Sequence, residues 1–121
     1  MTPNVFSSSG GLVTSGVLTG NSSTFRALLA TNADVNLRWL LLYSLNRTPI
    51  NTDAPVLAIP LLGNGSAAAP TVLELGRDFF GDSGIAGFPS GIAWAVSGSQ
   101  GSYDGTATAS EHQITLIGGS V

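Results

Sequence analysis

The side chains able to perform acid–base or nucleophilic chemistry are few and scattered in this 121-residue chain. It has one histidine, His112, and no cysteine. His112 alternates with Ile114 and Leu116, which places all three on one face of an expected terminal strand. A lone histidine in that setting is far more often a packed or surface residue than a catalytic base, because a catalytic triad needs partners. We therefore assign His112 no catalytic role.

Two glycine-rich stretches resemble motifs of known chemistry but lack the required context. Gly87–Gly91 has its serine at the wrong spacing for the G-x-S-x-G elbow of a hydrolase. Gly63–Ala68 resembles the G-x-G-x-x-A form of a dinucleotide fingerprint. Pro70 and the β-forming residues after it prevent the helix that should receive the pyrophosphate. We predict that Gly63–Ala68 is a turn.

The acidic residues form no recognisable site either. The stretch Asp78–Gly84 could offer oxygens to calcium, but it lacks the alternating acids and the distal glutamate of a calcium loop, and we predict a plain turn. Asp53, Asp82 and Asp104 stand beside turn residues, where a short carboxylate supports a bend. Sequence spacing does not exclude that two carboxylates converge as in a glycosidase, but nothing favours it. We expect no enzyme, no cofactor and no metal site.

The low charge of the chain is the most informative part of its composition. Charged residues make up only 9%, against about 25% in an ordinary globular protein. There is no lysine, and scattered arginines cannot form the cationic stripe that neutralises phosphates, so we expect no nucleic-acid partner. A surface with so little charge favours apolar area that a partner covers. The alternative is a monomer with a neutral surface of serine and glycine.

The length fits one domain, residues 1–121. The N-terminus lacks the basic and apolar regions of a secretion signal, and no stretch approaches the ~18 apolar residues that span a bilayer. We expect a soluble protein with no membrane partner. Because cysteine is absent, the core must hold the fold together without disulfides, unless oligomerisation helps.

Turn-forming residues recur about every ten residues and separate apolar runs of strand length, which predicts an all-β, antiparallel β-sandwich. The expected strands are Leu12–Leu18, Thr24–Thr31, Leu37–Leu45, Val56–Leu62, Thr71–Leu75, Ile92–Ser97 and His112–Ile117. Residues 25–33 could also form a short helix, but they have no cap, so we predict a strand. Pro60 cannot donate to a sheet ladder, so its strand should lie at a sheet edge or break there. The first 20 residues, rich in serine and glycine, are expected to form an extended N-terminal arm or an edge strand.

Two of these strands have informative alternation. The odd positions of Leu37–Leu45 are all apolar, and we expect them to face the core. The even positions, which include Arg38, Leu40 and Leu42, should form a half-apolar outer face, as in a central strand or a strand that meets another subunit. In Ile92–Ser97 large residues alternate with small ones, which predicts large side chains inside and small ones outside.

Three segments resemble motifs of small virion-associated proteins of tailed bacteriophages. Arg38–Leu45 matches an R-[YW]-L-x-L-Y strand, and Thr52–Leu61 matches a D-x-P-V-x-x-[IL]-P-[IL] segment. A later segment is matched by Phe80, Gly84-Ile85, Gly91-Ile92, Trp94 and Val96. The resemblance covers about residues 25–97. It implies a β-sandwich of jelly-roll type that oligomerises on the particle, often around three-fold positions.

The resemblance implies a capsid decoration or cement subunit. Such a protein is a structural homotrimer, made in the host cytoplasm, that binds the major capsid protein or another virion protein on the capsid exterior. Expected contact regions are the N-terminal arm and the loops Gly63–Pro70 and Ser97–Gly105, the latter with Tyr103 as an amphipathic anchor.

The alternative, from a different class, is a tail, spike or lectin-like module that binds a host surface glycan. The loop residues Phe88, Tyr103 and Asp104 are its candidate binding residues, on the expectation that they are exposed. One patch of aromatic side chains on loop tips favours the glycan, whereas a flat apolar base favours the shell.

Overall fold

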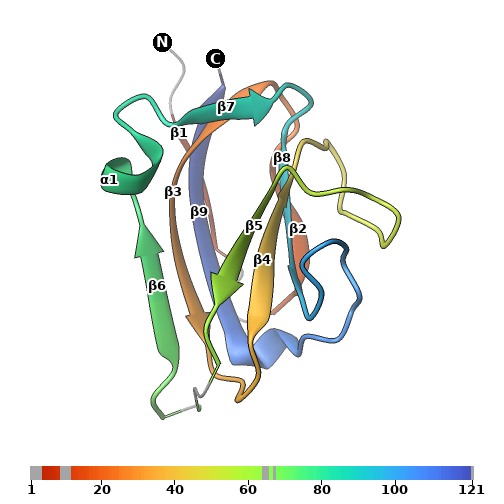
Figure 1. Ribbon diagram of the computed structural model, residues 1–121. Coiled ribbons are helices and arrows are strands. Elements are labelled where there is room, and N and C mark those ends of the chain that lie inside the picture. The colour runs from red at the N-terminus through yellow and green to blue at the C-terminus, as the bar shows by residue number, and fades with distance from the viewer. Residues whose placement is uncertain (1–3, 9–11, 64–65, 67, 121) are drawn as a thin grey trace.

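The computed structural model describes residues 4–8, 12–63, 66 and 68–120. They form two antiparallel β-sheets packed face to face, as Figure 1 shows. The strands are β1 (Asn4–Ser8), β2 (Ser15–Thr19), β3 (Ser23–Asn32), β4 (Arg38–Tyr43), β5 (Leu57–Leu61), β6 (Thr71–Leu75), β7 (Ile85–Phe88), β8 (Ile92–Ser97) and β9 (His112–Ser120). A short helix, α1 (Arg77–Phe80), and a 3-10 turn, η1 (Ala109–Glu111), join them. The predicted all-β sandwich is confirmed.

Each sheet combines strands from both ends of the chain. One sheet, called sheet A, has the order β1-β9-β3-β6, and β7 pairs with the part of β3 that lies beyond β6. The other sheet, called sheet B, has the order β2-β8-β4-β5. The last strand, β9, therefore lies inside sheet A, between β1 and β3.

The main core lies between the two sheets. Its fully buried members include Phe25 and Leu28 of β3, Leu40 and Leu42 of β4, and the large residues of β8. The Phe25 ring meets the Phe80 ring edge to face, with centroids 5.0 Å apart, so α1 is anchored on β3. Burial of such large apolar side chains is the dominant favourable contribution to folding.

Strand β4 is buried on both faces, which corrects the prediction about its two sides. The even residues Leu40 and Leu42 lie in the main core, whereas the odd residues Leu41 and Tyr43 lie in a second cluster with two alanines of β8. The expectation that the odd face fills the main core is therefore wrong. Both faces of β4 are apolar, so alternation alone cannot say which one meets the other sheet.

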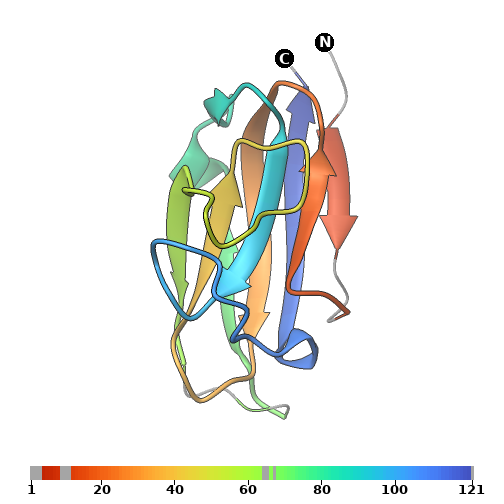
Figure 2. The same cartoon turned by 90° about the vertical axis from the view of Figure 1, so that its right-hand side faces the viewer.

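Two long loops cover this second cluster from the solvent side. Residues 44–56 contribute Leu45, and residues 98–108 contribute Tyr103. Figure 2 looks onto sheet B, with both loops crossing in front of its strands. On β8, Trp94 and its large neighbours face the main core as predicted, and the intervening alanines leave room for the loops.

The predicted strands are present with shifted ends. The predicted strand Thr71–Leu75 coincides with β6, and residues 25–32 belong to strand β3 and not to a helix. The strand that contains Pro60, β5, lies at an edge of sheet B as predicted. The plain turn predicted for Asp78–Gly84 is wrong in its first part, where α1 runs to Phe80. Elements as short as α1 and β7 carry too little periodicity to be predicted.

The N-terminal residues supply edge strands. β1 pairs with β9, and β2 pairs with β8. Of the two predicted alternatives, an arm or an edge strand, residues 4–8 and 15–19 form edge strands. Residues 1–3 and 9–11 of the predicted arm lie outside the described residues.

The turn before β8 requires glycine at position 91. Gly91 has φ +123°, and a Cβ there would collide with the Thr19 carbonyl oxygen and lie 2.8 Å from that of Leu45. We expect Gly91→Ala to lower the free energy of unfolding by about 2–4 kcal/mol, because strain and collision add. Chemical denaturation measures this. Gly101→Ala is the control, since nothing lies within 4 Å of its Cβ; equal effects of the two changes would contradict the prediction.

Candidate functional site

The loop of residues 44–56 is held by one ion pair. The Arg47 guanidinium donates through two nitrogens to the two carboxylate oxygens of Asp53, each at 2.8 Å. The Ile50 N–H also donates to Asp53, at 2.8 Å. These contacts, the Arg47 hydrogen bond first, lower the pKa of Asp53 to about 2. The loop that covers sheet B is therefore fixed by its own polar groups.

The loop of residues 98–108 is organised by the Asp104 carboxylate. Its Oδ1 accepts hydrogen bonds from Ser97 Oγ, from the Gly98 N–H and from Thr106, at 2.8–3.1 Å. Desolvation raises the pKa of Asp104, but these hydrogen bonds outweigh it and bring the pKa to about 2. The Asp104 side chain therefore serves its own loop, and its Oδ1 is already occupied by neighbours.

The three candidate residues for glycan binding do not form one site. Phe88 is only 1% exposed and packs against Phe25, because β7 pairs with β3, so the expectation that Phe88 is an exposed loop residue is wrong. Tyr103 is half-buried on the second cluster, and its hydroxyl is hydrogen-bonded to Thr14 Oγ1 at 2.7 Å. Asp104 is next to Tyr103, but both are used to hold the loop.

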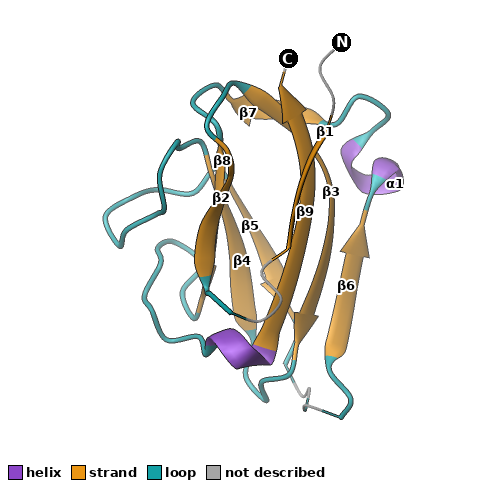
Figure 3. Cartoon of the chain, turned by 180° about the vertical axis from the view of Figure 1, so that it is seen from behind, coloured by secondary structure: helices purple, strands orange, loops and turns teal. Residues whose placement is uncertain are grey.

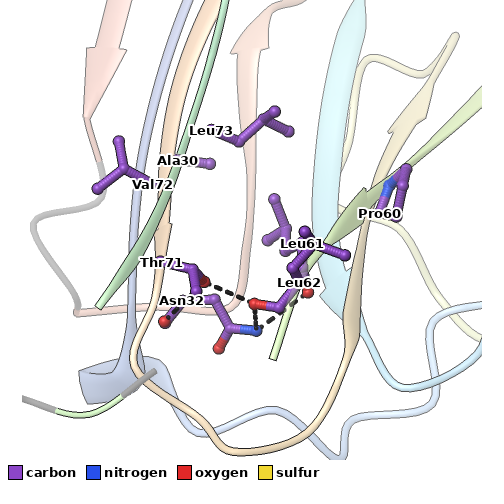
Figure 4. Close-up of a pocket in the computed structure, with 8 residues that line it drawn as sticks. All are labelled: Ala30, Asn32, Pro60, Leu61, Leu62, Thr71, Val72 and Leu73. Atoms are coloured by element: carbon purple, nitrogen blue, oxygen red, sulfur yellow. Dashed lines mark hydrogen bonds between the residues drawn. The ribbon is translucent and has the colours of Figure 1, made fainter. Parts of the chain in front are cut away.

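The end of the sandwich where β3 leads into β4 is locked by Asn32. The Asn32 side-chain amide donates to the carbonyl oxygens of Asn36, Leu61 and Leu62, each at 3.1 Å. Figure 4 shows this amide beside Thr71, whose hydroxyl donates to the Asn32 and Leu62 carbonyls. One buried side chain thus fixes the turn after β3 and the segment after β5 to each other.

A second interaction at this end is the ion pair of Arg38 and Asp34. Arg38 Nε and Nη2 lie 2.9 and 2.7 Å from Asp34 Oδ2. The Asn36 N–H is the largest influence on the pKa of Asp34 and lowers it, with Arg38 acting in the same direction. Arg38 also reaches Thr106 Oγ1 at 3.2 Å, so the same guanidinium ties this end to the loop over sheet B.

The locked turns present a cluster that the sequence does not reveal. Val35, Leu37 and Leu62 are exposed there, Val35 at 70% and Leu62 at 69%. They are neighbours because Gly63 packs against the Val35–Leu37 backbone, where a Cβ at position 63 would collide with the Val35 carbonyl oxygen. We call these three residues the apolar end. The one sequence signal is that Val35 and Leu62 adjoin the turn formers Asp34, Asn36 and Gly63.

The apolar end and the predicted loop Gly63–Pro70 are contiguous. Ser66 and Ala69 exchange backbone hydrogen bonds of 3.2 Å, which agrees with the predicted turn, and β6 follows it. Residues 64, 65 and 67 of that loop lie outside the described residues. The other predicted contact loop, Ser97–Gly105, instead covers sheet B.

His112 is packed at the same end of sheet A. It is 1% exposed and lies opposite Asn32 in the ladder, with Ile114 and Leu116 on its inward face as predicted. Neither ring nitrogen has a hydrogen-bond partner within the described part of the chain. Burial lowers the pKa of His112 below 6.5, opposed by the nearby Thr31 backbone and the charge of Glu111.

The hollows of the molecule are small or shallow. The cavity between the edges of β5 and β6, seen in Figure 4, has a volume of about 60 Å³. Typical sites for small molecules measure about 300–1,000 Å³. Within the described ranges, no three histidine, aspartate or glutamate side chains gather as metal ligands would. No helix in the same ranges is long and apolar enough to cross a membrane.

Comparisons with protein-family models, with curated proteins and with solved structures find no match to this chain. A functional assignment therefore depends on the residues and surfaces of the chain itself. The described surface is distinguished by apolar side chains on fixed backbone, and by loops whose polar groups are already engaged.

The two loop carboxylates give a test of how firmly the loops are held. We expect the NMR titration midpoints of Asp53 and Asp104 to lie at about 2. Both folded pKa values lie below the ordinary 3.8, so the stability they contribute is complete above about pH 4 and is lost as the pH falls towards 2. Arg47→Gln should raise the Asp53 midpoint, whereas Arg77→Gln should not. Midpoints near 3.8 in the native chain would show that the loops are loose.

Burial of an unpartnered histidine predicts acid sensitivity. Because the folded pKa of His112 lies below 6.5, the unfolded chain binds a proton more readily, and stability falls as the pH drops below about 6.5. We expect His112→Leu to reduce the loss of unfolding free energy between pH 7 and pH 5. Urea denaturation at both pH values measures it. An unchanged loss in the variant would contradict the prediction.

Proposed function

We propose that this protein is a structural subunit of a tailed-bacteriophage virion that binds the outer shell of the capsid and stabilises it. The observation that supports this role best is the apolar end, a cluster of exposed aliphatic side chains on locked turns. The resemblance of residues 25–97 to virion-associated proteins points to the same setting.

Exposed apolar side chains are numerous for so weakly charged a chain. Among the described residues, the large ones are Leu12, Val13, Leu29, Val35, Leu37, Ile50, Val56, Leu62, Val72 and Phe79. Scattered exposed apolar residues are ordinary, but a contiguous group marks a surface for association. The apolar end is such a group, and the Asn32 amide holds it in one conformation, so little entropy is lost when a partner covers it.

The strand pairing supports the sandwich type that the resemblance implies. β1 pairs with β9, β2 with β8, β3 with β6 and β4 with β5. One long hairpin rolled into two sheets produces this nested pairing, as in a jelly roll.

Capsid binding needs no active site and no single strong contact. A shell presents many copies of the same partner surface, so modest contacts repeated within one oligomer combine into tight attachment. The glycan-binding alternative is less well supported, because Phe88 is buried, while Tyr103 and Asp104 hold their own loop. Phe79, an exposed aromatic residue on α1, lies at the other end of the molecule from the apolar end (Figure 1).

Charge placed in the apolar end should abolish shell binding. We expect wild-type protein to sediment with empty capsids of its phage, and the double variant Val35→Asp, Leu62→Asp to remain in the supernatant, because two carboxylates would be desolvated. Both positions are largely exposed, so the fold should persist. Phe79→Asp, at the opposite end, is the matched control and should still sediment. Wild-type protein that ignores the capsids, or a double variant that binds them equally well, would refute the proposal.

A further inference from the structure

The outer face of sheet A is a second surface with nothing over it among the described elements. Figure 3 shows this sheet from behind, with β9, β3 and β6 side by side. The side chains that point outward follow from those that point inward. Phe25 and Leu28 both lie in the main core, and the register shifts between Phe25 and Ala27. The bulge therefore places Arg26 and Ala27 together on the outer side.

The same reasoning from alternate positions gives the rest of the face. Its members are Arg26, Ala27, Leu29, Thr31, Val72, Glu74, Gln113, Thr115 and Ile117. Leu29 is 42% exposed and Val72 62% exposed. A shallow hollow of about 320 Å³ over Ala27, Leu29 and Ile117 shows that the face is concave near its middle.

The face carries one cation and one anion, and neither is used within the chain. The ion pairs among the described residues involve Arg38, Arg47 and Arg77, but not Arg26 or Glu74. Arg26 Nε is buried and has no hydrogen-bond acceptor. A buried donor without an acceptor is unfavourable, and a guanidinium is best satisfied by a carboxylate. The face therefore offers, on itself, both halves of a missing ion pair.

We propose that a second copy of this chain covers the outer face of sheet A, related by a two-fold axis that crosses β3 between Arg26 and Leu29. In the ladder Leu29 lies directly opposite Glu74. Arg26 precedes Leu29 by three residues, about 10 Å along the strand at about 3.3 Å per residue. A half-turn about the axis exchanges these two levels, so Arg26 of the second copy lies level with Glu74, one strand (about 5 Å) to the side.

The two-fold operation makes the contact reciprocal. Two Arg26–Glu74 pairs form, one on each side of the axis, and Leu29 of each copy packs against Ala27 of the other. A face with equal and opposite charges is self-complementary, whereas a partner with a uniformly charged surface would repel one of the two. The pairing makes a dimer in place of the trimer that the resemblance implies.

The strands of the two copies run in opposite directions in such a dimer, so its two apolar ends point away from each other. Lying on a capsid, one dimer would reach two neighbouring capsid subunits, which deepens the proposed function and rests on it. The dimer itself requires no capsid, so the two proposals can fail separately.

Charge reversal tests the pairing. We expect light scattering to give the mass of a dimer for the wild-type protein and of a monomer for Arg26→Glu and for Glu74→Arg, with dimer dissociation constants raised at least about tenfold by like charges. When the two single variants are mixed, every contact again joins opposite charges. Native mass spectrometry of the mixture should therefore detect the mixed dimer.

The controls separate a lost contact from a lost fold. Gln100→Glu and Gln100→Arg add charge on the loop over sheet B and should remain dimers. Recovery of the dimer by mixing itself demonstrates that each single variant is folded. A monomeric wild-type protein, an oligomer indifferent to both reversals, or a mixture without the mixed dimer would each overturn the inference. The capsid sedimentation of Val35 and Leu62 variants is read independently of these results.

Discussion

Strands β4 and β8 are buried on both faces, and much of the remaining architecture serves to cover them. On one face they meet sheet A across the main core. On the other, Leu41 and Tyr43 exclude water only because two loops lie over them. A sheet with one solvated face needs only polar side chains on that face. Sheet B instead needs two ordered loops, and each loop needs hydrogen bonds of its own to stay in place.

That requirement decides which surfaces are available to partners. The Arg47–Asp53 pair and the Asp104 carboxylate act within their loops, so the loops serve the interior of the molecule. Association is left to surfaces that no described element covers, the apolar end and the outer face of sheet A. Both are carried by strands or by turns that Asn32 fixes, and a rigid surface loses little conformational entropy on binding.

The sequence predicts the fold better than the surfaces, for identifiable reasons. The alternation in β8, the position of Pro60 and the bounds of β6 follow from local patterns, and they agree with the structure. The two faces of β4 are equally apolar, so their directions depend on contacts distant in the sequence. Phe88 follows a glycine and precedes a proline, which suggests an exposed turn, but pairing of β7 with β3 buries it. The apolar end likewise exists only because two separate turns meet.

The position of β9 has a consequence for how the protein reaches its fold. β9 is the last strand in the sequence, yet it lies inside sheet A and pairs with β1 and β3. Before β9 leaves the ribosome, β3 lacks a neighbour along most of its length, and its apolar side chains have no complete core to enter. Topologies dominated by such distant pairings fold in milliseconds to seconds, far more slowly than helical bundles. During synthesis the nascent chain should therefore remain open, and its unpaired strand edges should make it a client for chaperones.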